Sequence, residues 1–258
     1  MENPDNFIPS ETLRFLDNKG EERLKFKKRR MYNLIKIAQP DEALYREIML
    51  SLGYKNNKVQ FLELALILPY FQIRELKDRE TIEKALLYRG GFMESKDGLP
   101  ENFDFSLKMD KSVWNHQGVR PNNYPEKRIS GISIFLAETI ETGIYTFFRD
   151  KIIKCFSEKI DRIAAISIVR EITLFNGIGK DRRLEIFFNI ILPFYEVIFE
   201  EEGNSELVNF LNQLYEKHPP LADNSITKKV KKELSISPNN AIDSAKRYMG
   251  LIQIYKNK

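Results

Sequence analysis

The chain has 258 residues, of which 42% are hydrophobic and 30% charged, and its net charge is +4. This balance is typical of a soluble globular protein long enough to bury a substantial core, and it excludes a disordered chain. With one Cys and two His, an intramolecular disulfide and a zinc site built from Cys and His alone are also excluded.

Membrane and secretion signals are absent from the sequence. The longest apolar run, 187–199, has thirteen residues and contains Asn189 and Pro193, so it is too short to span a bilayer. The first residues lack the basic start and apolar stretch of a signal peptide. We therefore expect a cytoplasmic protein.

Helical periodicity dominates the first third of the chain. The predicted helices cover 20–40, 42–53, 58–68 and 79–91. We expect the first to be basic and to end before Pro40, with Asp41 capping the second and Gly53 ending it. Asn57 and Asp78 are predicted to cap the third and fourth helices, and the third is apolar nearly all round, which predicts burial on every side.

Residues 92–126 lose this periodicity and carry several Gly and Pro, which predicts a long irregular connection of the kind that often has a function. Helical patterns resume over 126–143, 144–157, 159–173, 181–202, 204–217, 224–236 and 240–256. The β-branched segment near 161–173 also suits a buried strand. Asp181 is predicted to cap the longest of these helices, and Pro193 to kink it.

These elements predict an all-α protein of about ten helices, packed in one large domain or in two closely packed lobes. After an N-terminal tail over 1–11, we expect a single helical domain over 12–258. Its candidate lobes are 12–91 and 126–258, joined by the loop 92–125.

Enzymatic motifs are weak. Pro40-Asp41 followed by Glu75-Leu76-Lys77 has the letters of a metal-dependent nuclease motif, but that motif sits on strands and these residues lie in predicted helices. His116 has no base or acid partner that the sequence identifies, and Cys155 lies in a helical pattern where a small apolar role is expected. We therefore predict no catalytic residue, no metal site and no cofactor, and hold an enzyme to be the less favoured class.

A glycine-containing segment, "NGIGKDRR" (176–183), places Lys180, Arg182 and Arg183 at a predicted helix start, where free backbone amides can bind phosphate. The segment matches neither of the common phosphate-binding fingerprints. A glycine helix end followed by a capped helix is the favoured interpretation.

Two clusters of basic residues are candidates for phosphate binding. The segment 20–36 carries seven basic and two acidic side chains, a net charge of +5, and "TKKVKK" (227–232) adds four Lys. On a helix such charges usually form a solvated face, which is the favoured interpretation. The candidate binding residues in the two clusters are Lys27, Lys28, Arg29, Arg30, Lys228 and Lys229.

The stretch "WNHQGVRPNNYPEKRISG" (114–131) gathers the only Trp, one His and two Pro. Its candidate binding residues are Arg120, Asn122, Asn123 and Arg128. One interpretation is a binding loop that presents planar donors to a carboxylate or phosphate. The other is an ordered connection, anchored by Trp114, whose Arg side chains bond carbonyls at helix ends.

The order and spacing of several segments resemble the C-terminal half of an uncharacterised bacterial family, labelled conserved hypothetical or domain of unknown function. The segments are "LYREIMLSLGYKNNKVQFLELALILP" (44–69), "ALLYRGGFME" (85–94), "GVRPNNYPEKRISGIS" (118–133), "IGKDRRLEIFFNIILPF" (178–194), "YEKHPPLADNSITKKV" (215–230) and "AKRYMGLIQIY" (245–255). The resemblance covers about residues 12–256.

The resemblance implies that full-length relatives carry an N-terminal half with a nuclease-like metal fold, which would have ended before this chain starts. Relatives also continue into a short Cys-containing tail beyond the last residues here. What carries over is the helical module, with Arg120, Pro121, Asn123, Pro125 and Arg128 at matching positions. Such a likeness of fold assigns no catalytic role.

Three hypotheses follow. The leading one is a non-catalytic helical accessory module that binds nucleic acid or a nuclease-like partner protein, with no membrane partner. The second is a purely structural interaction or oligomerisation domain. The third is a metal-dependent hydrolase that uses Glu, Asp and His116.

Overall fold

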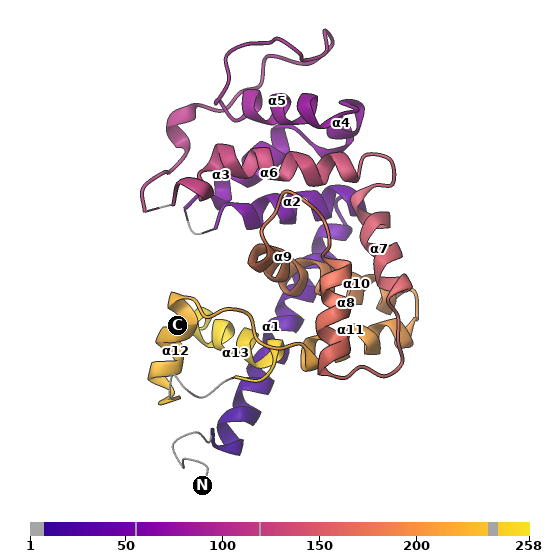
Figure 1. The fold of residues 1–258 in the computed structure, drawn as a ribbon, viewed down its shortest axis with the longest axis vertical. Helices are drawn as coiled ribbons and strands as arrows, with labels where there is room; N and C mark the ends of the chain where they lie inside the picture. Colours follow the sequence, from indigo (N-terminus) through magenta and orange to yellow (C-terminus); the bar gives the residue numbers. More distant parts are fainter. Residues whose placement is uncertain (1–7, 55, 119, 237–241) are drawn as a thin grey trace. The chain divides into compact units, whose positions relative to one another are not determined.

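The computed structural model describes residues 8–54, 56–118, 120–236 and 242–258, in which every regular element is helical and none is a strand. The predicted all-α class is confirmed (Figure 1). The α-helices are α1 (Ser10–Ile35), α2 (Pro40–Leu52), α3 (Lys58–Ile67), α4 (Tyr70–Glu75), α5 (Arg79–Arg89), α6 (Pro125–Glu138), α7 (Ile144–Lys154), α8 (Arg162–Ile172), α9 (Lys180–Ile186), α10 (Leu192–Glu201), α11 (Ser205–Lys217), α12 (Ser225–Glu233) and α13 (Ala245–Lys256). Within the described residues, none of these helices has the length and apolar character needed to cross a membrane.

The chain divides into two compact units, each built from segments that are distant in sequence. Unit 1 comprises Met1–Asn33, Lys151–Thr173 and Phe187–Lys258, and unit 2 comprises Leu34–Asp150 and Leu174–Ile186. The irregular segment 92–125 therefore lies entirely within unit 2. That residues 12–258 form a single domain stays a prediction.

Unit 2 is a packed group of helices in which α2 lies against α3 and α4, and α5 lies against α6 (Figure 1). Its core is rich in aromatic side chains, of which Tyr45, Phe61, Tyr70, Phe135 and Phe148 are fully buried. The two buried Tyr hydroxyls donate to carbonyl oxygens, that of Tyr45 to Leu68 at 3.0 Å and that of Tyr70 to Thr139 at 2.8 Å. This satisfies the polar end of each ring, which a buried tyrosine requires.

Unit 1 pairs α10 with α11 and α12 with α13, and α13 crosses the first half of α1. The crossing brings two glycines together. A Cβ atom on Gly250 would lie 2.3 Å from the Leu16 carbonyl oxygen, and one on Gly20 would lie 2.3 Å from the Lys246 carbonyl oxygen. Both glycines are needed because any side chain would force the two helix backbones apart.

Most predicted helices are observed, including the β-branched segment that forms α8, and the segment 92–126 is irregular apart from two single turns at Lys111–Val113 and Pro121–Asn123. The first boundary is wrong, because α1 begins at Ser10 instead of residue 20 and ends at Ile35. Residues 1–7 of the predicted tail lie outside the described residues.

The predicted helix caps divide into right and wrong by what else their side chains contact. Asp78 caps α5 as predicted, accepting the amide of Thr81 at 2.9 Å. The Asp41 carboxylate instead accepts the amide of Tyr145, 104 residues away, at 2.7 Å, and Gln39 precedes α2. Asn57 precedes α3 but its side chain caps nothing, because it bonds the backbone of a later segment.

Helix α3 is not buried all round, contrary to the prediction. Val59 and Leu66 are 72% and 51% exposed, while Phe61 and Leu64 are fully buried. The helix packs by one face against α2 and α5, so its remaining apolar side chains face solvent.

The predicted long helix over 181–202 is interrupted, and Asp181 lies in the first turn of α9 instead of capping it. A π-helical segment, Phe187–Ile191, separates α9 from α10. Pro193 follows directly, and its ring conflicts with a regular helix at the carbonyl four residues earlier, that of Asn189. The wider π turn at Asn189 accommodates that conflict.

Candidate functional site

The stretch 114–131 is anchored to unit 2 by Trp114 and Asn115. The Trp114 ring is buried edge-on against Phe61, with centroids 5.1 Å apart, and its indole N–H donates to the Gly90 carbonyl oxygen at 2.7 Å. Asn57 holds the backbone of Asn115 by two hydrogen bonds, each of 2.8 Å. Trp114 therefore anchors this stretch in the core, as expected.

Two of the predicted binding residues, Arg128 and Arg182, meet at the C-terminal end of α2. Arg128 donates to the Leu52 carbonyl oxygen, and Arg182 donates to that of Ser51 at 3.3 Å. Their guanidinium groups lie 3.6 and 3.3 Å from the centroid of the Tyr54 ring.

These contacts satisfy carbonyls that a helix end leaves without partners, and they place positive charge where the helix dipole favours it. Burial, with a smaller effect of the neighbouring Arg182 charge, lowers the pKa of Arg128 to about 10. The pair thus has the geometry of the second interpretation of the stretch, in which Arg side chains bond carbonyls at helix ends.

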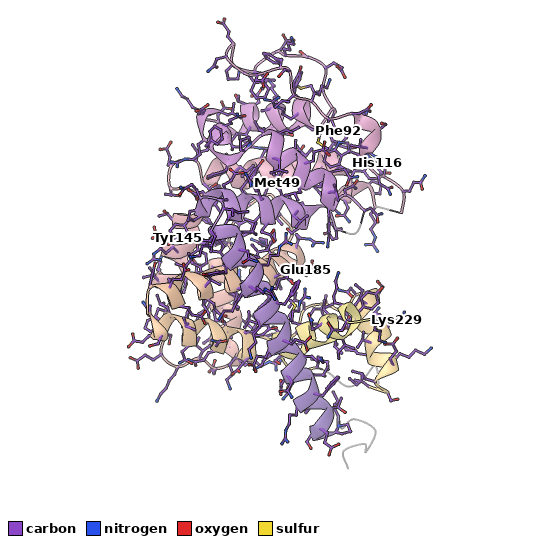
Figure 2. The ribbon with its side chains drawn as sticks, turned by 180° about the vertical axis from the view of Figure 1, so that it is seen from behind. Met49, Phe92, His116, Tyr145, Glu185 and Lys229 are labelled. Carbon is purple, nitrogen blue, oxygen red and sulfur yellow. The ribbon has the colours of Figure 1, made fainter. Side chains whose placement is uncertain are left out.

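The other predicted residues of this stretch face solvent. Arg120 and Asn122 are exposed and Asn123 is half-buried, in the single turn Pro121–Asn123. His116 lies nearby (Figure 2), with its Nε2 3.1 Å from a carboxylate oxygen of Glu126. Among the described residues no group of three or more Asp, Glu, His or Cys side chains is arranged to hold a metal ion.

The segment "NGIGKDRR" is used mainly inside unit 2. Gly177, at φ +80°, crosses Gly131 so closely that a Cβ atom on it would lie 1.8 Å from the Gly131 carbonyl oxygen. Arg183 donates to the Phe175 carbonyl oxygen at 2.9 Å. Only Lys180, of the three predicted cations here, is exposed.

The basic cluster on α1 is divided between protein contacts and solvent. Lys28 is paired with Glu200 and lies 3.4 Å from Glu196, both on α10. Arg29 and Arg30 are exposed, as is Phe26 at 59%, whereas Lys27 is half-buried.

Helix α12 carries the most open group of cations. Asn224 and Thr227 form a reciprocal capping box at its start, and Thr227 and Val230 bury one face. The opposite face exposes Lys228, Lys229 and Lys232, which we call the α12 lysine face. Figure 2 labels Lys229 on this helix.

Nearby acidic groups do not neutralise the α12 lysine face. Asp223 is paired with Lys231 at 2.7 Å and Glu233 with Lys258 at 2.6 Å. In the part of the chain that the structure describes, no member of the face forms an ion pair. Residues 225–258 contain eight basic and two acidic side chains, a net charge of +6 that exceeds the +4 of the whole chain.

An aromatic ring lies beside these lysines. The Lys229 ammonium is 5.8 Å from the centroid of the Tyr255 ring, which is partly exposed on α13. Cations with an adjacent aromatic side chain can contact phosphates and a stacked base. Tyr255 and Lys232 were not among the predicted binding residues. Lys232 was within the recognised cluster, whereas Tyr255 becomes its neighbour only through the pairing of α12 with α13.

Comparison with known proteins identifies one family. A family model described as "Protein of unknown function (DUF2851)" matches residues 6–224. No curated protein and no solved structure matches the chain. The α12 lysine face lies directly after the matched residues.

Proposed function

We propose that this chain, which belongs to the DUF2851 family of proteins of unknown function, is a non-catalytic helical module that binds nucleic acid through its C-terminal helices. The observation that carries the proposal is the α12 lysine face, three exposed lysines without ion pairs among the described residues, on a segment of net charge +6. The exposed Arg29 and Arg30 on α1 supply a second group of cations in the same unit.

Contacts of this kind recognise the phosphate backbone and not the base sequence. Solvated lysines bind phosphates by displacing condensed counterions, so affinity depends steeply on salt. Tyr255 adds a ring on which an unpaired base can stack, which favours single-stranded over duplex nucleic acid.

The test is the binding of labelled single-stranded DNA or RNA, followed by fluorescence anisotropy between about 50 and 200 mM salt. We expect the variant K228E/K229E/K232E to bind more weakly and to reduce the salt slope by about 3, one unit for each lost phosphate contact. A matched control, K111E/K127E/K154E, reverses three exposed lysines elsewhere and should retain the wild-type slope. Equal slopes for the two triple variants, or no binding at low salt, would refute the proposal.

The finer identity of the module is also part of the proposal. We take the protein to be bacterial and cytoplasmic, and its partner to be a nuclease-like polypeptide of the kind that the resemblance implies for longer relatives. If a partner protein co-purifies and charge reversal on α12 changes nothing, the chain is an interaction domain instead.

A further inference from the structure

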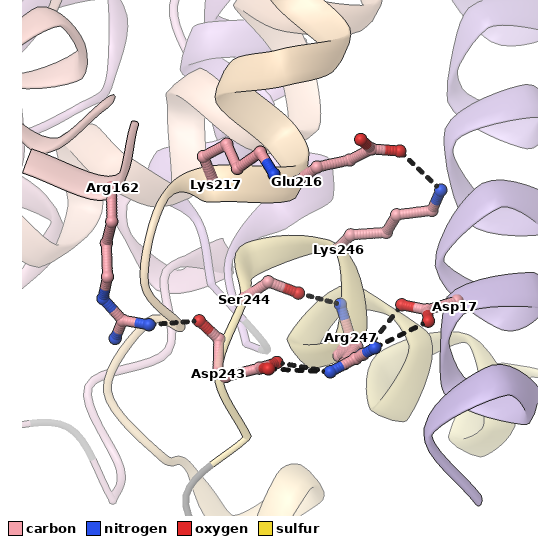
Figure 3. A pocket seen from close by; sticks show the side chains of 8 residues that line it. All are labelled: Asp17, Arg162, Glu216, Lys217, Asp243, Ser244, Lys246 and Arg247. Carbon is pink, nitrogen blue, oxygen red and sulfur yellow. Dashed lines mark hydrogen bonds and ion pairs between the residues drawn. The ribbon is translucent and has the colours of Figure 1, made fainter. Parts of the chain in front are cut away.

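A polar cavity of about 460 Å³ lies in unit 1, where the start of α13 meets α1, α8 and the end of α11 (Figure 3). Every side chain that lines it is polar or charged: Asp17, Arg162, Glu216, Lys217, Asp243, Ser244, Lys246 and Arg247. Its volume falls within the range of small-molecule sites, but a lining without any apolar side chain is unusual for them. Such a lining suits a small, highly charged group.

Two of the four cations in this cavity are neutralised by carboxylates. Arg247 is held by Asp17 through two bonds of 2.9 Å and by Asp243 at 2.7 and 2.8 Å (Figure 3). Lys246 is paired with Glu216 at 3.0 Å. These contacts fix three carboxylates and two cations in place, and they leave no carboxylate of the lining without a cation.

The remaining two cations have no carboxylate partner among the described residues. Arg162 donates to the Asp243 carbonyl oxygen at 2.9 Å through one nitrogen only, which leaves most of its donors available. Lys217, in the last turn of α11, makes no ion pair within the described ranges. The cavity therefore carries one positive charge in excess, with four cations against three anions.

The start of α13 adds to this positive potential. The helix has twelve residues and begins at Ala245, after its cap Ser244, so the positive end of its dipole lies at the cavity. Ser244 accepts the amide of Arg247 at 3.3 Å, which fixes the backbone there.

We propose that this cavity binds a phosphate monoester, with Arg162 and Lys217 as the residues that hold the phosphate. A monoester carries close to two negative charges near neutral pH, which the unpaired cations match, whereas an internal phosphodiester carries one and is flanked by ester groups on both sides. The phosphate can come from a small phosphorylated molecule such as a mononucleotide, or from the end of a nucleic-acid strand. The site is separate from the α12 lysine face, and it does not depend on that face.

Calorimetric titration distinguishes the sources with four probes: adenosine, adenosine 5′-monophosphate, and one oligonucleotide with and without a 5′-phosphate. We expect at least tenfold tighter binding for the phosphorylated member of at least one pair. Preference within the first pair identifies a small ligand, and preference within the second pair alone identifies a strand end. Equal binding within both pairs would overturn the proposal.

Substitutions then locate the site. The variant R162A/K217A should weaken the phosphorylated probe at least tenfold, while R170A/K154A, which removes the same charge from exposed positions of unit 1, should bind as the wild type does. K228E/K229E/K232E should lose backbone binding but keep the preference for the 5′-phosphate, so the two proposals fail independently. Retained preference in R162A/K217A, with a normal melting temperature, would refute this assignment.

Discussion

Glu196 is a buried acid whose ionisation is expected to make the protein less stable as the pH rises. It lies on α10 with 1% of its side chain exposed, and its Oε1 atom has no hydrogen-bond partner among the described residues. Burial is the main cause that raises its pKa, from an ordinary value of 4.5 to about 7, and the nearby ammonium of Lys28, 3.4 Å away, opposes this only in part.

The direction of the effect follows from proton linkage. An acid with a raised pKa in the folded state binds its proton more tightly there than in the unfolded chain, so the folded state is favoured at low pH. That advantage is lost as the pH rises from the unfolded value of 4.5 towards the folded value of about 7. Between pH 5 and pH 8 the loss is about 2 to 3 kcal/mol in the free energy of unfolding.

Glu196→Gln removes this ionisation while keeping the shape of the side chain. Urea denaturation at several pH values should show the wild type losing about 2 to 3 kcal/mol relative to the variant from pH 5 to pH 8. Lys28→Met should cost more at pH 8 than at pH 5, and this difference should shrink in the Glu196→Gln background. Parallel stability curves for the wild type and Glu196→Gln would refute the reasoning.

Three further predictions concern the scaffold. Arg128→Ala should lower the free energy of unfolding by about 1 to 3 kcal/mol, because it removes bonds to the end of α2, whereas Arg120→Ala, at an exposed position, should change the melting temperature little. Gly250→Ala should destabilise the protein by about 1 to 3 kcal/mol in urea, because its Cβ atom meets a helix backbone, while Gly179→Ala, with nothing within 4 Å, should not. Trp114→Phe should cost about 1 to 3 kcal/mol by leaving a buried carbonyl without its donor, and it should blue-shift no remaining Trp fluorescence, since the chain has a single Trp.

The sequence predicts which segments are helices much better than it predicts which side chains cap them. Periodicity is a local property, and it identifies nearly every helix, including the β-branched α8. Capping by Asp41 and Asn57 was a local prediction too, but each side chain is taken by a distant amide, that of Tyr145 or of Asn115. Such partners are decided by tertiary packing, which the sequence does not display.

The same limit applies to the candidate cavity. Its lining comes from α1, α8, α11 and the start of α13, and only folding brings these segments together. Asp17 and Arg247 are 230 residues apart in the chain. Neither Arg162 nor Lys217 stands out in the sequence, because each is one of 41 basic residues in the chain.

The chemical difference between arginine and lysine explains how the predicted binding residues are distributed. Arg128, Arg182 and Arg183 all bond backbone carbonyls. A planar, weakly hydrated guanidinium can be partly buried at low cost while it donates several hydrogen bonds.

By contrast, Lys228 and Lys229 stay in solvent, since a compact ammonium is strongly hydrated and its flexible stem keeps it at the surface. A count of positive charge in a sequence therefore overstates the cations available to a ligand, and overstates it most where the cations are arginines near helix ends. It follows that the lysine-rich α12, more than the arginine-containing stretch 114–131, is where a polyanion meets charge that the fold has not already used.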